Sequence, residues 1–188
     1  MNIRTTTFAL AAAFAVAASA ALAAPAPFVL ARDGKAQIAI VPHGGIATNG
    51  VNFAATELTN FLNRITGAEF RISDKPVPGL KTLALGTPYQ AKAVDEISIR
   101  VKDANTLEVT GDGPIGTVYA AYDLLETFGC VFVAHDFAYA PRKSEISLPG
   151  DYAKTDAPFF YEQRSTWSEI AYGGNRNKWS QILRTRMQ

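Results

Sequence analysis

One stretch, residues 111–130, constrains the fold of this chain more than any other. Asp112 is placed to cap a helix, and Pro114 suits the first helical turn, where its missing N–H would be unpaired in any case. Gly129 can take the left-handed conformation that ends a helix. Apolar residues three and four positions apart form one helix face: Ile115, Val118, Tyr119, Tyr122 and Leu125. The stretch therefore predicts a strongly apolar helix between two strands, which other elements must cover.

The same stretch contains the glycine pattern of a dinucleotide-binding turn, at Gly111, Gly113 and Gly116. It follows a predicted strand and opens a helix, and Asp136 stands where the ribose-binding acid of such sites is expected. The other interpretation is a tight turn into a buried helix, in which Gly116 allows close packing. We favour the tight turn because the preceding strand is expected to be the second arm of a hairpin and no second glycine-rich unit follows. A dinucleotide-binding domain remains an alternative hypothesis.

Residues 1–24 have the pattern of a cleaved signal peptide. Arg4 supplies a positive charge near the start, residues 8–22 are apolar and rich in alanine, and small residues at 21–24 fit a cleavage site. Pro25 follows at once, which argues against a membrane-spanning helix. We expect an exported protein, periplasmic or secreted, with no membrane attachment after cleavage.

The composition limits partners and cofactors. The formal net charge is +1 at pH 7, which provides no strongly basic surface for nucleic acid. The single cysteine, Cys130, excludes an internal disulfide, and its place on an apolar strand predicts a buried thiol rather than a nucleophile. The two histidines, His43 and His135, lack metal-ligand spacing. We expect no metal and no cofactor.

The remaining pattern of residues 25–157 predicts an α+β domain. A second helix is expected at residues 51–66, ended by Gly67, and residues 154–158 are expected to form a linker. Asp33-Gly34 is a hairpin signal between the first two strands. The expected strands are residues 28–31, 37–41, 70–73, 82–86, 97–101, 106–110 and 131–134, with an antiparallel hairpin formed by 97–101 and 106–110.

The charged side chains of this domain are expected on its surface. The helix at residues 51–66 has an apolar face: Ala54, Leu58, Phe61, Leu62 and Ile65. Its other face is polar: Glu57, Asn60, Asn63 and Arg64. Carboxylates on predicted helix faces and strand ends are Glu57, Asp95, Glu96, Glu108, Asp123 and Glu126. We expect each of these carboxylates to be solvated.

Three segments, residues 54–68, 83–87 and 111–130, together resemble the N-terminal α/β domain that precedes the catalytic barrel in α-glucuronidases. The second domain of β-N-acetylhexosaminidases and the N-terminal domain of α-N-acetylglucosaminidases have a similar plan. The resemblance implies a mixed, mostly antiparallel sheet with two helices packed on it. It also implies that residues 158–188 are the incomplete start of a TIM barrel. The glycine-rich turn then needs no nucleotide.

The resemblance further implies that this domain is not catalytic. In those enzymes two carboxylates on the barrel carry the chemistry, so we assign no catalytic residue here and expect this chain alone to be inactive. The implied partners are its own catalytic barrel and, through the barrel, an oligosaccharide substrate. Arg164 and Trp167 are the candidates for sugar contact, on a Tyr-x-x-Arg phrase similar to the hexosaminidase pattern. A free-standing carbohydrate-binding or accessory domain is the alternative.

Overall fold

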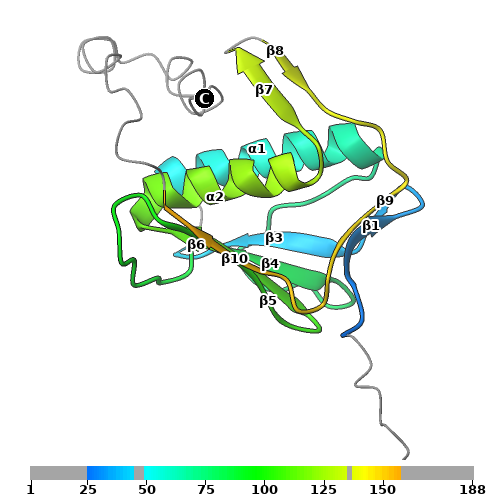
Figure 1. Ribbon diagram of the computed structural model, residues 1–188. Coiled ribbons are helices and arrows are strands. Elements are labelled where there is room, and N and C mark those ends of the chain that lie inside the picture. Colours follow the sequence, from blue (N-terminus) through cyan, green and yellow to red (C-terminus); the bar gives the residue numbers. More distant parts are fainter. Residues whose placement is uncertain (1–24, 45–48, 135–136, 158–188) are drawn as a thin grey trace, which may run out of the picture.

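The computed structural model describes residues 25–44, 49–134 and 137–157. Two helices, α1 (Asn49–Thr66) and α2 (Gly113–Thr127), lie side by side on one face of a five-stranded sheet (Figure 1). The strands of this sheet, in spatial order, are β10 (Ala153–Asp156), β5 (Ile97–Asp103), β6 (Thr106–Gly111), β4 (Lys81–Leu85) and β3 (Ile38–Pro42). The predicted α+β class is confirmed.

The five-stranded sheet combines parallel and antiparallel pairs. β3, β4 and β6 are parallel, and α1 is the crossover between β3 and β4. β5 and β10 add antiparallel strands, so the predicted hairpin of residues 97–101 and 106–110 is confirmed as β5–β6. Residues in register across the sheet form a fully buried apolar layer: Ile40, Leu83, Leu107, Leu85, Val109 and Ile99.

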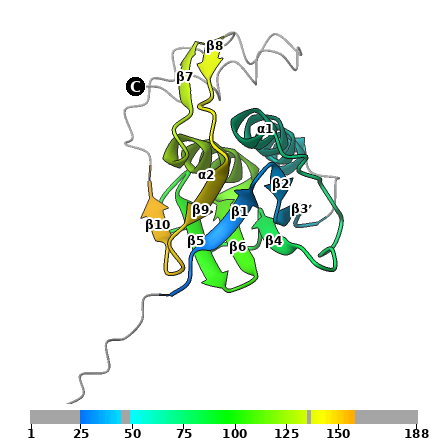
Figure 2. The ribbon, with the colours of Figure 1, turned by 90° about the vertical axis from the view of Figure 1, so that its right-hand side faces the viewer.

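A smaller sheet closes one end of this arrangement, in the order β2 (Lys35–Ala36), β1 (Phe28–Arg32) and β9 (Glu145–Leu148). Figure 2 shows β1 and β9 at the near end of the molecule, between the helices and the large sheet. The predicted turn is present, with positive φ at Asp33 and Gly34. The second arm of the hairpin at this turn consists of β2 alone, because β3 belongs to the large sheet. The run at Ile38–Pro42 is almost entirely buried, which suits a strand of a parallel sheet.

Both helices end as predicted and the expected apolar face of α1 is buried, whereas the expected face of α2 needs correction. Gly67 and Gly129 have φ of 71° and 95°, in the left-handed region that glycine tolerates. α2 is buried on several sides because it contacts α1 as well as β5 and β6, yet Ile115 of its predicted apolar face is 46% exposed. Asp112 is the N-cap residue but makes no side-chain capping bond. Its carboxylate accepts a hydrogen bond from the Asp95 N–H instead.

Three further expectations differ from the structure. The strand expected at residues 70–73 is reduced to a single bridge between Ile72 and Ile40. The expected linker at 154–158 is largely β10, an edge strand of the large sheet. The strand at Val131–Ala134, β7, pairs with β8 (Phe137–Tyr139) in a separate hairpin that the sequence did not predict. The expected barrel start lies outside the described residues. No helix in the described part of the chain is long and apolar enough to cross a membrane.

Candidate functional site

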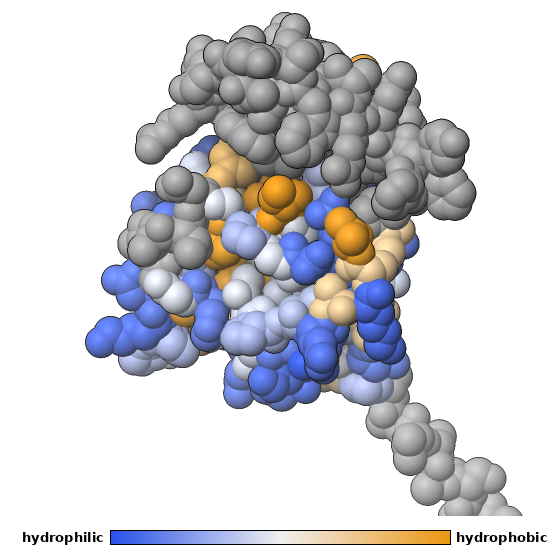
Figure 3. Space-filling model, turned by 90° about the vertical axis from the view of Figure 1, so that its left-hand side faces the viewer, coloured by the Kyte–Doolittle hydropathy of each residue, from blue (hydrophilic) through white to orange (hydrophobic). Residues whose placement is uncertain are grey.

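The carboxyl ends of β3, β4 and β6 meet at the edge of the molecule where both helices begin (Figure 1). We call this the helix-start edge. In α/β sheets such an edge is the usual place for ligands, and here it carries the glycine-rich turn and the loop at residues 86–96. Figure 3 looks onto this end of the molecule, where separate hydrophobic side chains lie among hydrophilic ones.

The glycines of the turn are required by the turn's own backbone. A Cβ atom on Gly111 would lie 2.4 Å from the carbonyl carbon of Gly116 and 2.7 Å from the carbonyl oxygen of Glu96. A Cβ atom on Gly116 would lie 2.9 Å from the carbonyl carbon of Gly111. Gly113 has φ of 63°, and the Gly116 N–H already donates to the Asp112 carbonyl at 3.1 Å.

The interpretation of this turn as a tight entry into a buried helix is therefore confirmed. Close approach of one backbone to another explains Gly111 and Gly116 without a phosphate. The preceding strand β6 is a hairpin arm paired antiparallel with β5, as expected, but it also pairs parallel with β4, which the sequence did not predict. Asp136, the other residue of the dinucleotide hypothesis, lies outside the described residues.

Glu96 joins the loop at residues 86–96 to this turn. Its carboxylate accepts hydrogen bonds from the Tyr89 hydroxyl and from the Lys92 N–H, the latter at 3.1 Å. Its own carbonyl accepts the Asp112 N–H at 2.8 Å. The Tyr89 hydrogen bond outweighs burial and lowers the pKa of Glu96, and the same bond raises the pKa of Tyr89. Glu96 is therefore held as a carboxylate that accepts hydrogen bonds.

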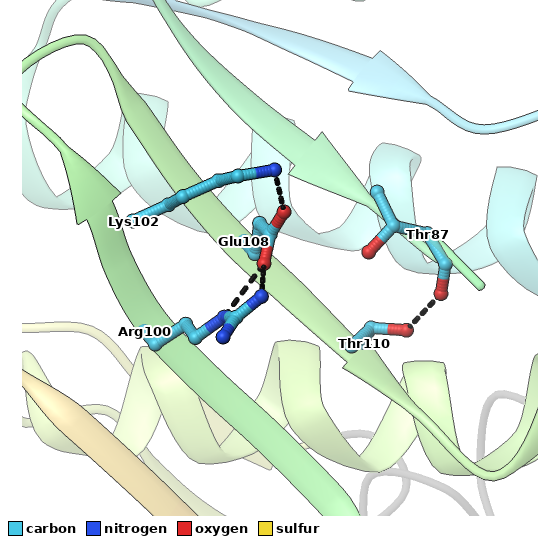
Figure 4. A network of polar contacts seen from close by, with 5 residues as sticks. All are labelled: Thr87, Arg100, Lys102, Glu108 and Thr110. Carbon is cyan, nitrogen blue, oxygen red and sulfur yellow. Dashed lines mark hydrogen bonds and ion pairs between the residues drawn. The ribbon is translucent and has the colours of Figure 1, made fainter. Parts of the chain in front are cut away.

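Glu108 forms a second polar centre, on the sheet face turned away from the helices (Figure 4). Arg100 lies opposite it on β5 and donates from Nε at 2.7 Å, and Lys102 donates from Nζ at 2.8 Å. Burial acts to raise the pKa of Glu108, but the hydrogen bonds from Lys102 and Arg100 outweigh it and lower the pKa. Beside this centre, the Thr110 hydroxyl donates to the Thr87 carbonyl at 2.6 Å.

Two more carboxylates are buried between elements. Lys154 of β10 contacts both carboxylate oxygens of Asp123 on α2, at 2.6 and 2.7 Å. The Tyr122 hydroxyl donates to the carboxylate of Glu57, which joins α2 to α1, at 2.7 Å. Exposed fractions are 3% for Asp123 and 4% for Glu57, so these side chains belong to the interior.

The expectation that the acidic residues are solvated was wrong for four of them: Glu57, Glu96, Glu108 and Asp123. The partners of Glu108 could have been found, because the predicted β5–β6 hairpin brings Arg100 opposite it. The Asp123–Lys154 pair could not, because Lys154 was assigned to a linker. Glu126 is exposed, as expected.

Each of the four buried carboxylates contacts a group from another part of the domain. Cys130 is buried, as expected, and burial raises the pKa of its thiol to about 11. His43 is exposed, and in the described ranges no group of three or more His, Cys, Asp or Glu residues could hold a metal ion.

The largest grouping of exposed apolar side chains lies on the β7–β8 hairpin. It comprises Val131, Val133, Phe137 and Tyr139, which we call the hairpin patch. Of the seven large hydrophobic residues that are exposed in the described structure, these are four. Exposed apolar groupings of this kind mark interaction surfaces. The predicted sugar-contact residues Arg164 and Trp167 lie outside the described residues.

No protein-family model matches this chain, and no curated protein matches it significantly. Among solved structures, the family GH115 4-O-methyl-α-glucuronidase BtGH115A, with specificity for decorated arabinogalactans, matches 86% of this chain with a TM-score of 0.59 and 17% identity. The match covers 25% of that enzyme's chain.

Two other matches are looser. A GH138 enzyme that targets pectin rhamnogalacturonan II matches 64% of this chain and 15% of its own, with a TM-score of 0.43 and 20% identity. A mutant Streptomyces plicatus β-hexosaminidase matches 53% of this chain and 18% of its own, with a TM-score of 0.35 and 17% identity. This chain thus spans a quarter or less of the length of these three proteins. The likeness to the GH115 enzyme shows the fold alone, an α+β domain similar to part of that enzyme's chain.

Proposed function

We propose that this chain is the non-catalytic N-terminal domain of an exported glycoside hydrolase that acts in polysaccharide breakdown. The enzyme would be similar to α-glucuronidases or hexosaminidases, and this domain would pack against its catalytic barrel. One observation carries the proposal. The fold matches 86% of this chain but only 25% of a GH115 α-glucuronidase chain, as expected for one domain of a larger enzyme.

The state of the buried acids supports a structural role. Glycoside hydrolysis uses two carboxyl groups on either side of the scissile bond, one of which must be able to give a proton. The carboxylates of Glu108 and Asp123 are paired with arginine or lysine side chains. The carboxylates of Glu96 and Glu57 accept hydrogen bonds from tyrosine hydroxyls. These groups link elements of the domain to one another, which suits a scaffold.

Export and sugar contact extend the proposal beyond the domain itself. The sequence pattern of residues 1–24 supports export to the periplasm or the medium. Arg164 and Trp167 remain our candidates for sugar contact, at the start of the proposed barrel. The oligosaccharide would reach this protein through the barrel rather than through the α+β domain.

Hydrolysis assays test the proposal directly. The purified chain should cleave neither aryl glycosides nor glucuronoxylan fragments, while the native protein from its own cells should have a mass several times larger and should cleave one of them. Hydrolysis by this chain alone would refute the non-catalytic role. A native protein as short as residues 25–188 that binds xylo-oligosaccharides in calorimetry would replace the proposal with a free-standing carbohydrate-binding domain.

A further inference from the structure

The β7–β8 hairpin is an unusual element for a surface position. Its described residues are Val131–Ala134 and Phe137–Tyr139, and none of them is charged. The hairpin follows α2 and stands above the helices, on the side away from the large sheet (Figures 1 and 2). Exposed strands are normally protected from association by charged side chains. This hairpin has no such protection among its described residues.

One face of the hairpin is anchored to the helices. Phe132 is buried and makes edge-to-face contacts with Phe61 of α1 and Tyr122 of α2, at centroid distances of 5.1 and 4.9 Å. The Arg64 guanidinium donates to the Ala138 carbonyl at 3.1 Å. A two-stranded hairpin is marginally stable without such support. These contacts therefore fix the hairpin in a defined orientation.

The other face is open. Val131, Val133, Phe137 and Tyr139 are 47%, 59%, 61% and 55% exposed, although all are large and apolar or aromatic. Val131 and Tyr139 are paired across the two strands, so these two side chains are neighbours in the patch. Covering these side chains would be favourable, because about half of each apolar surface remains in contact with water. The hairpin patch is thus a preformed apolar surface on which another segment can dock.

Residues 158–188 of the same chain have the matching chemistry. This segment follows β10 and contains Phe159, Phe160, Tyr161 and both tryptophans of the chain, Trp167 and Trp179. Aromatic side chains gain most from docking on an apolar surface. Because the segment is covalently attached, its effective concentration at the patch is high.

The position of β10 allows this contact. Asp156 pairs with Ile97, near the beginning of α2, whereas the hairpin follows the end of α2. The separation is thus comparable to the length of α2, about 22 Å for 15 residues. Residues 158–188 can span on the order of 100 Å when extended. We infer that the hairpin patch is the docking surface for residues 158–188 of this chain.

This inference rests on the proposed function and deepens it, because it names the surface against which the start of the proposed barrel packs. The test uses the fluorescence of the purified chain, because Trp167 and Trp179 are its only tryptophans. Wild-type emission should be shielded from acrylamide. In the double variant Val133→Lys/Phe137→Lys, quenching should rise severalfold, to the level of the denatured chain. The control Val94→Lys, at a position 61% exposed and outside the hairpin, should keep the wild-type value.

The possible outcomes distinguish docking within one chain from burial of the tryptophans elsewhere and from association between chains. Accessible tryptophans in the wild type, or shielding that survives in the double variant, would overturn the inference. Shielding that disappears on dilution would also overturn it, because a second copy of the chain would then cover the patch. Far-ultraviolet circular dichroism must show that both variants are folded. If the double variant is unfolded, the milder Val133→Thr replaces it. None of these results depends on hydrolytic activity, so the proposed function is tested separately.

Discussion

Replacing Gly116 with alanine should destabilise the domain, although alanine is the better helix former. Gly116 lies in the first turn of α2, where the backbone of Gly111 and the carbonyl of Glu96 pass close by. The new Cβ atom would lie 2.9 Å from the Gly111 carbonyl carbon and 3.1 Å from the Glu96 oxygen. Both neighbours are backbone atoms of paired elements, so neither can move without disturbing the β5–β6 pairing or the start of α2.

The magnitude follows from two opposed effects. Alanine gains up to about 1 kcal/mol over glycine from helix propensity. Forcing an extra carbon into a closely packed place costs about 1–3 kcal/mol, and the upper end applies where the neighbours are backbone. We expect a net loss of about 2 kcal/mol in the free energy of unfolding. For a domain of this size the midpoint of thermal unfolding would fall by roughly 5–8 °C.

Chemical and thermal denaturation of the purified chain measure this loss. Ile115→Ala is the matched control, because Ile115 is the preceding residue of α2 and is 46% exposed. The control should lose at most about 1 kcal/mol, because only about half of the Ile115 side chain is buried. A Gly116→Ala protein as stable as wild type would refute the packing explanation of the turn. Protection of the wild type against heat by NAD would do the same and would restore the dinucleotide hypothesis.

Three further predictions concern the buried polar groups. Lys154→Met should destabilise the domain by about 2 kcal/mol in denaturant titrations, because it removes the cation that contacts the buried Asp123 carboxylate; an unchanged midpoint would contradict this role. Because the pKa of Glu108 is lowered on folding, its contribution to stability is present above its unfolded pKa of about 4.3 and is lost as the pH falls through the folded value. In Glu108→Gln the free energy of unfolding should therefore depend less on pH below about pH 4.5. A dependence as steep as that of the wild type would argue against this contribution. Cys130 should not react with a thiol reagent at pH 8 until the protein is unfolded, because burial raises its pKa to about 11; rapid native labelling would show that the thiol is accessible.

Local signals in the sequence predicted the framework of the fold. Helix ends were predicted because Gly67 and Gly129 can take a positive φ that most residues avoid. The β5–β6 hairpin was predicted because its apolar side chains alternate along both strands, as required when one face is buried. Both signals depend only on neighbouring residues, so they need no knowledge of the tertiary arrangement.

Features that depend on distant segments were not predictable in the same way. β10 is short and polar, and it becomes a strand only because β5 offers an unpaired edge. The burial of Glu57 depends on how α1 crosses α2, which no local pattern specifies. The predicted second arm of the first hairpin is divided between β2 in the small sheet and β3 in the large sheet. This division follows from the burial of Ile38–Pro42, which is possible only when the other strands and the helices of the large sheet are in place.

The buried pairs explain how a small domain could hold a docking surface in a fixed place. Asp123–Lys154 joins α2 to β10, and the Tyr122–Glu57 bond joins α2 to α1. The ring of Tyr122 also supports Phe132 at the base of the hairpin. Breaking a buried pair leaves an uncompensated charge, which costs far more than the pair itself contributes, so such pairs disfavour alternative packings. The orientation of the hairpin patch is therefore coupled through Tyr122 to the polar contact between the helices. If residues 158–188 dock on the patch, removal of this hydrogen bond by Tyr122→Phe should make their tryptophans more accessible to acrylamide.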